Sequence, residues 1–271
     1  IGKLILLPAT EVVVWRTGLA AMGFAVLAQW LGGSLRVAPA VILRLLGIGA
    51  LVGVHWILFF LSARLSNVSV SMVALPTTIL WCALLEPLFD RNRRISKLEL
   101  VTGLIMIGAV WLIFRAEFSR GLGFAVGLGA AFVGSLFAVA NKKLVVSHHF
   151  AVVSFYEMAG ACLASMIAVP FFAGTQAVWH LPAGRDFFWL FVLSMVCTVG
   201  AYGGYMEILR RMSVFTINVI YNLEPVYGIV LAALIFGSTE LMSSGFYIGT
   251  AIIMGTVIVM PLLQRRLQRL G

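Results

Sequence analysis

The stretch VFTINVIYNLEPVYGIVLAALIF, residues 214–236, constrains the fold of this chain more than any other. It is apolar over a length that suffices to cross a bilayer, because a helix of about 20 residues spans the hydrocarbon core. Its centre nevertheless holds polar side chains and a proline: Asn218, Tyr221, Asn222, Glu224 and Pro225. Polar groups inside lipid are costly unless they face protein or water. The stretch therefore predicts a membrane-spanning helix with a polar centre turned toward other helices or an aqueous cavity.

The composition extends this prediction to the whole chain of 271 residues, of which 62% are hydrophobic and 11% charged. A soluble domain carries about 25% charged residues, so the sequence predicts an all-α, polytopic membrane protein. The net charge of +9 does not indicate a nucleic-acid partner, because nearly all Lys and Arg lie in short gaps between apolar runs. The three cysteines lie within apolar runs, so no disulfide framework is expected.

Nine apolar runs have the length of a complete membrane span, and the gaps between them are too short for a soluble domain. The runs cover residues 8–31, 38–62, 68–89, 96–114, 122–145, 150–173, 186–209, 214–236 and 244–263.

The chain also repeats itself. Trp15-Arg16-Thr17 aligns with Phe155-Tyr156-Glu157, and Ala74-Leu75-Pro76 aligns with Leu223-Glu224-Pro225. We expect a first repeat over residues 1–117 and a second over 118–271. Projected onto the first repeat, the span 122–141 corresponds to about 20 residues before Ile1. We therefore expect an intact protein to have ten helices in two sets of five, with the first helix missing here.

An odd number of spans in each repeat places the two repeats in opposite orientations, which is the inverted-repeat plan of secondary transporters. Positive charges test this arrangement, because cytoplasmic loops are enriched in Lys and Arg. With both termini in the cytoplasm, thirteen Lys and Arg fall on the inner side and five on the outer side. The charge distribution therefore favours this orientation.

Both halves resemble the repeat of the EamA-type drug/metabolite transporter superfamily. The resemblance is carried by VVVWRTGLAA and VVSFYEMAGA early in each half, and later by the proline-centred helices MVALPTTILWCALLEPLF and VIYNLEPVYGIVLAALIF, each followed by a glycine-containing helix. It implies a ten-helix permease of a bacterial inner membrane that exports or exchanges small organic molecules, without a cofactor and without enzyme activity. It also implies a central cavity enclosed by helices from both repeats.

The helix 214–236 provides the first candidate site residues. Asn218, Tyr221 and Asn222 share one face with Pro225, and their side chains can hydrogen-bond a substrate or hold neighbouring helices together. Glu224 is a candidate for proton coupling or for binding a cationic substrate. The alternative is a protonated Glu224 that donates to a backbone carbonyl freed by the proline.

Other candidates lie on the runs 68–89 and 38–62. Thr78 can face the cavity or bond only to its own helix, and Trp81 can stack on a substrate or pack against lipid. His55 can bind substrate, relay protons or make an interhelical bond. The remaining predicted substrate contacts are Trp56, Phe59, Tyr202 and Tyr205.

Two ionisable residues, Arg16 and Glu157, occupy near-equivalent positions in the two repeats, and we interpret both as ties between helices. Asn141 is expected near the cytoplasmic end of its helix, as part of a gate or as a plain interfacial residue. No metal site is predicted, because no second ligand lies at a suitable spacing from His55.

The sequence thus predicts a secondary transporter of small metabolites, such as amino acids, that works by alternating access with Pro76 and Pro225 as hinges. The expected partners are the substrate and membrane lipids, and a monomer is compatible with the sequence. A lipid flippase is an alternative that requires a polar groove open to lipid. An intramembrane lipid-modifying protein would require clustered acid, base or metal ligands.

Overall fold

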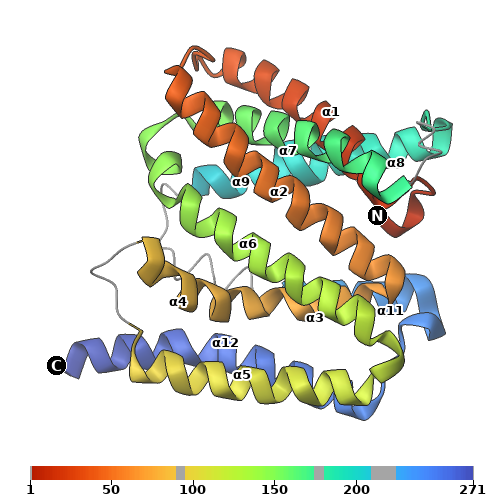
Figure 1. Ribbon diagram of the computed structural model, residues 1–271, viewed down its shortest axis with the longest axis vertical. Helices are drawn as coiled ribbons and strands as arrows, with labels where there is room; N and C mark the ends of the chain where they lie inside the picture. The colour runs from red at the N-terminus through yellow and green to blue at the C-terminus, as the bar shows by residue number, and fades with distance from the viewer. Residues whose placement is uncertain (1, 90–94, 174–179, 209–223, 271) are drawn as a thin grey trace. The chain divides into compact units, whose positions relative to one another are not determined.

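The computed structural model describes residues 2–89, 95–173, 180–208 and 224–270, and the regular elements within these ranges are helices (Figure 1). Seven helices among the described residues are long and apolar enough to cross a membrane, and Ser244–Met260 forms a shorter apolar helix. The prediction of an all-α membrane protein is confirmed. Within the stretch 214–236, residues 214–223 lie outside the described residues, and Glu224–Phe236 is helical.

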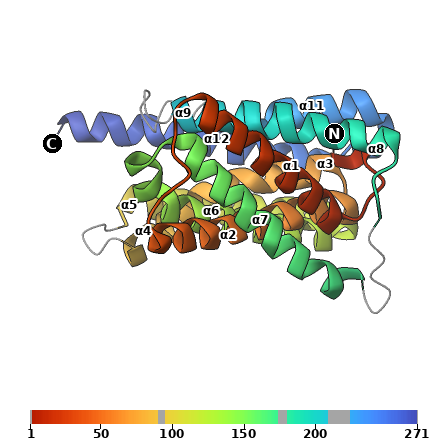
Figure 2. The same ribbon diagram turned by 90° about the horizontal axis from the view of Figure 1, so that it is seen from above.

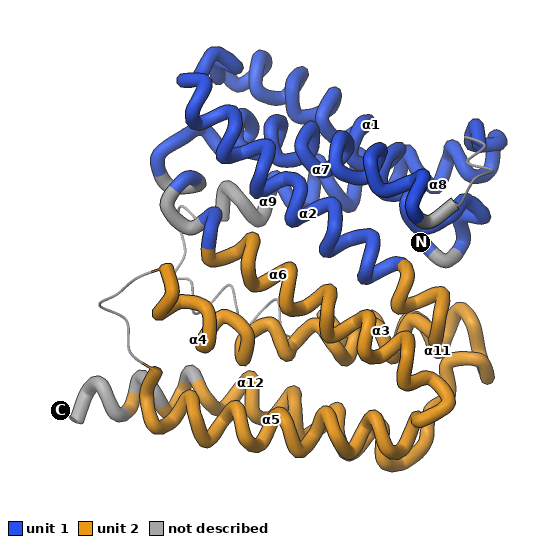
Figure 3. Tube along the Cα trace, in the orientation of Figure 1, with its two compact units in different colours: residues 1–60, 140–212 blue, residues 61–139, 213–271 orange. Residues whose placement is uncertain are grey.

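The chain divides into two compact units (Figure 3). Unit 1 contains residues 1–60 and 140–212, and unit 2 contains residues 61–139 and 213–271. Each unit therefore contains residues of both predicted repeats, because the boundary between the repeats at residue 117 falls within the segment 61–139 of unit 2. Two long helices, α2 (Pro39–Leu65) and α6 (Gly121–Ser147), contribute residues to both units.

Unit 1 is organised around a pair of antiparallel helices, α1 (Ala9–Trp30) and α7 (Phe150–Ala173) (Figure 2). Gly33, just after α1, lies beside the ring of His149, just before α7, and Gly18 lies beside the sulfur of Cys162. These contacts at two levels fix the opposite directions of the two helices.

Close backbone contact joins α2 to α7 within unit 1. A Cβ atom built on Gly160 would overlap the carbonyl oxygen of Leu46, and one built on Gly49 would overlap the carbonyl oxygen of Glu157. Membrane helices gain no hydrophobic driving force from each other in lipid, so such small residues promote van der Waals packing by allowing close approach.

The remaining helical segment of unit 1 runs through α8 (Gly184–Ser194), η5 (Met195–Gly200) and α9 (Ala201–Ile208). The middle element, η5, is a π-helical segment. Within it, the Thr198 hydroxyl donates to the carbonyl of Leu193, five residues earlier, at 2.9 Å. Such π-helical turns widen an α-helix locally and are frequent at functional sites.

Unit 2 contains a helix that is interrupted at Pro76. Helix α3 (Val68–Ala74) gives way to the short 3-10 segment η2 (Leu75–Thr77), after which α4 (Thr78–Phe89) begins. Proline lacks the backbone N–H that an α-helix needs at this position. The hydroxyl of Thr77 donates to the carbonyl of Ala74, and that of Thr78 to the carbonyl of Leu75, both at 2.6 Å.

Two more antiparallel pairs complete unit 2. Helix α5 (Lys97–Ala116) packs against α12 (Ser244–Leu270) (Figure 1), with Gly249 against Ile113 and Gly245 against Ala116. Helix α11 (Glu224–Phe236) packs against α3, with Gly228 against Met72. A cluster of fully or almost fully buried side chains fills the space between these helices and includes Val70, Val73, Met106, Ile113, Phe124, Phe246 and Ile253.

Buried carboxylates stabilise helix N-termini in unit 2. Glu240, in the short segment η6 (Gly237–Glu240), is fully buried. It accepts hydrogen bonds from the backbone N–H groups of Val68 and Ser69 at 3.2 and 2.9 Å, and from the Ser69 hydroxyl at 2.9 Å. These N–H groups lie in the first turn of α3 and have no partner within the helix. A carboxylate is also favoured there by the helix dipole.

Glu117 plays a similar part where α5 ends. Its Oε1 accepts from the backbone N–H of Ser243 at 2.8 Å, immediately before α12, and its Oε2 pairs with Arg120, in the short segment η3 (Phe118–Arg120), at 2.6 Å. Burial raises the pKa of Glu117, but the hydrogen bonds from Ser243 and the Arg120 charge outweigh it, so the pKa lies below its usual value. The ionised form of Glu117 therefore stabilises the folded protein.

Candidate functional site

The predicted site residues fall into three groups. Asn218, Tyr221 and Asn222 lie outside the described residues, as does the side chain of Tyr205. The second group belongs to unit 1 and consists of His55, Trp56, Phe59 and Tyr202. The third group belongs to unit 2 and consists of Pro76, Thr78, Trp81, Glu224 and Pro225.

Trp56 is part of a contact between three helical segments of unit 1. The guanidinium carbon of Arg16 on α1 lies 3.7 Å from the centroid of the Trp56 ring on α2. Its Nε donates a hydrogen bond of 2.9 Å to the hydroxyl of Thr198 in η5. Arg16 is buried in the first half of a membrane-spanning helix, where a desolvated cation–aromatic contact contributes about 2 kcal/mol.

His55 and Phe59 flank Trp56 on α2, and both side chains are half-buried. The ring of Phe59 packs edge-to-face against that of Phe60, with centroids 5.7 Å apart. The Phe60 ring in turn lies 5.8 Å from the Arg16 guanidinium. Phe59, one of the predicted substrate contacts, is thus connected through Phe60 to the buried guanidinium of Arg16.

Tyr202 on α9 binds the carboxyl group of Glu157 on α7. Its hydroxyl donates to Oε2 at 2.7 Å, and its ring packs edge-to-face against Phe24 of α1 at 6.5 Å. Glu157 is fully buried, and the side chain of Asn141, near the end of α6, also interacts with its carboxyl group. Arg16 and Glu157 therefore both join helices, as the sequence led us to expect.

These contacts form a continuous group of polar side chains that we call the unit 1 polar cluster. Thr198 and Tyr202 are one helical turn apart, so they connect the surroundings of Arg16 to those of Glu157. The residues of the cluster are Arg16, Trp56, Thr198, Tyr202, Glu157 and Asn141. The cluster brings an arginine, a carboxyl group and several neutral polar side chains into the membrane-spanning part of one unit. Each of these groups can bind a polar ligand or hold helices together.

In unit 2 the predicted residues are more dispersed. Thr78 uses its hydroxyl for the carbonyl of its own helix at Leu75. The ring of Trp81 packs edge-to-face against Phe132 of α6 at 5.3 Å, and its buried Nε1 has no hydrogen-bond partner. Glu224 is exposed at the beginning of α11, next to the buried Pro225.

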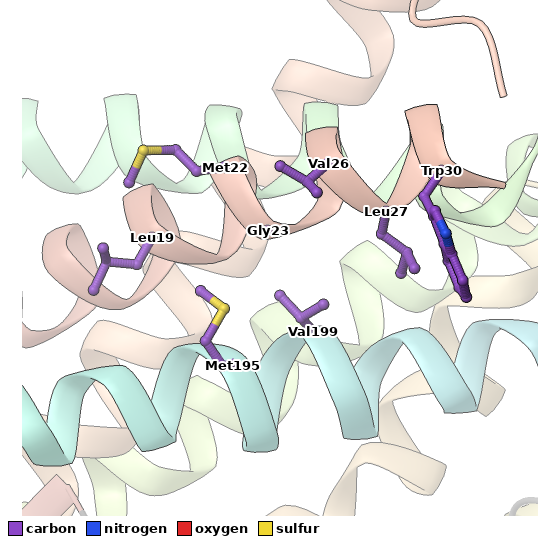
Figure 4. Close-up of a pocket in the computed structure, with 8 residues that line it drawn as sticks. All are labelled: Leu19, Met22, Gly23, Val26, Leu27, Trp30, Met195 and Val199. Carbon is purple, nitrogen blue, oxygen red and sulfur yellow. The ribbon is translucent and has the colours of Figure 1, made fainter. Parts of the chain in front are cut away.

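An apolar groove of about 460 Å³ lies between α1 and η5 (Figure 4). Its lining residues are Leu19, Met22, Gly23, Val26, Leu27 and Trp30 of α1, and Met195 and Val199 of η5. None of the predicted site residues lines it. A lipid flippase would require a polar groove, so this groove does not favour that alternative.

Metal chemistry has no visible basis in the described residues, where no three His, Cys, Asp or Glu side chains come together. A separate polar contact of unit 1 involves the buried Glu11. Its Oε1 lies 3.0 Å from Nδ1 of His180, and the backbone N–H of His180 donates to Oε2 at 3.2 Å. This pair ties the start of α1 to the segment before α8.

Comparison with known proteins identifies the family. The model of the EamA-like transporter family matches residues 121–262, which is just over half of the chain. The chain belongs to the EamA-like transporter family. This EamA-like protein is also similar to a protein of known crystal structure, with a TM-score of 0.65 and 17% identity over 96% of this chain and 90% of the other. That similarity concerns the fold. No curated protein matches the chain.

Membership confirms the resemblance noted in the sequence, and it makes this EamA-like chain a multi-pass membrane protein related to transporters rather than to enzymes. Sequence reasoning missed two features of the polar cluster. Thr198 is one hydroxyl in an apolar run, and nothing in the sequence singled it out. The partnership of Tyr202 with Glu157 was also missed, although both residues were noted separately.

Proposed function

We propose that this chain is a secondary transporter of small organic metabolites, such as amino acids, and that it exports or exchanges them by alternating access around a central cavity. The observation that carries the proposal is the pairing of helices in a member of the EamA-like family. Helices α1 and α7, α3 and α11, and α5 and α12 pack together, and the members of each pair occupy equivalent places in the predicted repeats.

The directions of these pairs support an inverted repeat over residues 1–117 and 118–271. Each pair is antiparallel, as shown by Gly33 beside His149 and by Gly245 beside Ala116. In the pair of α3 and α11, the backbone carbonyl of Thr239, after the end of α11, accepts a hydrogen bond from the side chain of Asn67, which precedes α3. Equivalent helices that cross a membrane in opposite directions are what two inverted repeats require.

The interrupted helix α3–η2–α4 supports a hinge at Pro76. Discontinuous helices are common at the binding sites of transporters, because irregular backbone in a membrane is tolerated where it lines a cavity. Pro225, the repeat equivalent of Pro76, would supply the second hinge. Thr78, Trp81, Tyr221 and Asn222 then belong to the substrate-binding surface near these hinges.

We further propose a bacterial inner membrane as the location, with both termini in the cytoplasm. The excess of Lys and Arg in the inner loops supports this orientation. We also propose His55, Trp56, Phe59, Tyr202, Tyr205 and Asn218 as substrate contacts, and Glu224 as a residue for proton coupling.

Counterflow in proteoliposomes tests the proposal. Liposomes containing the purified protein are loaded in turn with each unlabelled amino acid of a panel, and uptake of the same labelled amino acid is measured against protein-free liposomes. At least one amino acid should accumulate transiently. Counterflow should fall in Asn222→Ala and persist in Trp111→Ala, because Trp111 on α5 is 57% exposed and is not among the proposed substrate contacts.

Two results would contradict the proposal. One is the absence of counterflow for every member of a panel extended to organic acids and amines, in protein whose helix content and single elution peak show that it is folded. The other is equal loss of counterflow in Asn222→Ala and Trp111→Ala, which would separate transport from the polar centre of the stretch 214–236.

A further inference from the structure

Glu157 has an environment that its role as a tie between helices does not explain. It is fully buried in the first half of α7, within the membrane-spanning stretch Phe150–Phe171. Its backbone is in close contact with Gly49 of α2, and its carboxyl group meets side chains of α6 and α9.

The groups that touch this carboxyl are neutral. Tyr202 donates its hydroxyl to Oε2 at 2.7 Å, and Asn141 contributes a side-chain amide. Oε1 of Glu157 is buried without a hydrogen-bond partner, and so is Oδ1 of Asn141. Two buried acceptors in one cluster lack a donor, and a buried acceptor without a donor costs about 1–3 kcal/mol.

Among the side chains that the structure describes, the charged groups on the surrounding helices are engaged elsewhere or lie at other levels. On α1, Glu11 pairs with His180 and Arg16 binds Thr198. On α2, Arg44 is exposed and His55 lies more than a turn beyond Gly49. On α7 itself, the Tyr156 hydroxyl donates to the carbonyl of Leu35. No described cation forms an ion pair with Glu157.

We propose that Glu157 is a proton-binding site, at which a proton on Oε1 neutralises the carboxyl group and supplies the missing donor. An ionised carboxylate without a cation is strongly disfavoured in a low-dielectric interior, and such a group takes up a proton instead. The neutral acid keeps the bond from Tyr202 on Oε2 and carries an O–H donor on Oε1. Such a donor is what the buried Oδ1 of Asn141 lacks. The reaction is the uptake of one proton from water by one carboxylate.

The proton at Glu157 also couples the transport cycle to the proton gradient, and this second part rests on the proposed transport function. Glu157 lies on α7 and its donor Tyr202 lies on α9, directly after the π-helical segment η5. A movement of α9 that separates the two side chains would expose the carboxyl group to water and release its proton. Because the proton is bound at the contact between two helices, its release would accompany their separation.

Infrared spectroscopy tests the first part without any transported substrate. In liposomes at neutral pH, the wild-type protein should show a carboxylic-acid C=O band that shifts in D₂O, and Glu157→Gln should lose it. Glu240→Gln is the matched control, because Glu240 is equally buried but has backbone N–H donors on both oxygens. That variant should retain the band. Tyr202→Phe should shift the band to higher frequency, since it removes the hydrogen bond to the acid.

A band that is unchanged in Glu157→Gln and in Tyr202→Phe would overturn the proton site. If Glu157→Gln fails to fold, the response of the band to Tyr202→Phe decides the question.

The second part is tested with the amino acid that gives counterflow. An inward proton gradient should change wild-type uptake, and the ratio of uptake with and without the gradient should fall to one in Glu157→Gln. A ratio equal to that of the wild type would overturn the coupling, whereas absence of wild-type transport would contradict the proposed function and leave the infrared result standing.

Discussion

The close contact between α2 and α7 makes Gly160 highly sensitive to a single added methyl group. A Cβ at this position would overlap the carbonyl oxygen of Leu46 and lie 2.8 Å from its Cα and 2.9 Å from its carbonyl carbon. Carbon atoms pack at about 3.5–4.0 Å. Since the obstructing atoms are backbone, no side-chain rotation relieves the overlap, and the two helices must move apart by roughly 1 Å.

The cost follows from two opposing terms. Overpacking of this kind destabilises by about 1–3 kcal/mol, whereas replacing glycine by alanine within a helix gains about 1 kcal/mol. Gly47→Ala isolates the second term, because Gly47 lies within the partner helix α2 and a Cβ there meets nothing within 4 Å. We therefore expect Gly160→Ala to be less stable than Gly47→Ala by about 1–3 kcal/mol.

Reversible unfolding in mixed micelles of detergent and SDS, followed by circular dichroism, measures this difference. A thiol-reactive dye gives a second readout, since all three cysteines are partly buried in the folded protein. If Gly160→Ala and Gly47→Ala unfold at the same SDS fraction, the two backbones do not approach each other as closely as described, and the packing argument for unit 1 is wrong.

Three further predictions concern charged groups. The pKa of Glu117 is lowered in the folded protein, so the ionised group contributes stability above about pH 4.3, its unfolded pKa, and this contribution is lost as the pH falls through the lower folded pKa. The free energy of unfolding should therefore depend less on pH between about pH 6 and pH 3 in Glu117→Gln than in the wild type. The same pH dependence in both proteins would contradict the prediction. Glu240→Ala should destabilise the protein by about 2–4 kcal/mol, because two first-turn N–H groups of α3 lose their acceptor; a change below about 0.5 kcal/mol would show that water replaces the carboxylate. Arg16→Lys should cost about 1–3 kcal/mol, since lysine keeps the charge but loses the planar contact with Trp56 and the Nε bond to Thr198; unfolding as stable as that of the wild type would show that the charge alone matters.

Much of the fold could be predicted because its determinants are local. The spans follow from the apolar length that a bilayer demands. The interruption at Pro76 follows from the missing N–H of proline. The pairing of α1 with α7 was not predicted as such, but the repeat alignment of Arg16 with Tyr156 places these two helices at equivalent positions. Residues 214–223, which the sequence marks as the most informative, lie outside the described residues, so their predicted roles stay predictions.

The candidate site was less accessible to sequence reasoning. Arg16 and Glu157 were recognised because ionisable residues are rare and costly in apolar runs. Their partners were not, because a threonine or a tyrosine in a membrane helix carries no mark of what it will bind. The capping of α3 by Glu240 had no sequence signal either, since donor and acceptor are more than 170 residues apart.

The sequence by itself determined that this protein is a bundle of membrane helices that resembles the EamA-like family, because hydrophobic length and helix interruption act over a few turns of chain. Only the tertiary structure decided which helices pair within each unit, and that Glu157 meets Tyr202 while Arg16 meets Trp56 and Thr198. Arg16 and Thr198 are 182 residues apart in the chain. Contacts of that kind depend on how closely the helix backbones approach each other. Glycines such as Gly49 on α2 and Gly160 on α7 allow this approach, but the sequence does not say which helix lies opposite each of them.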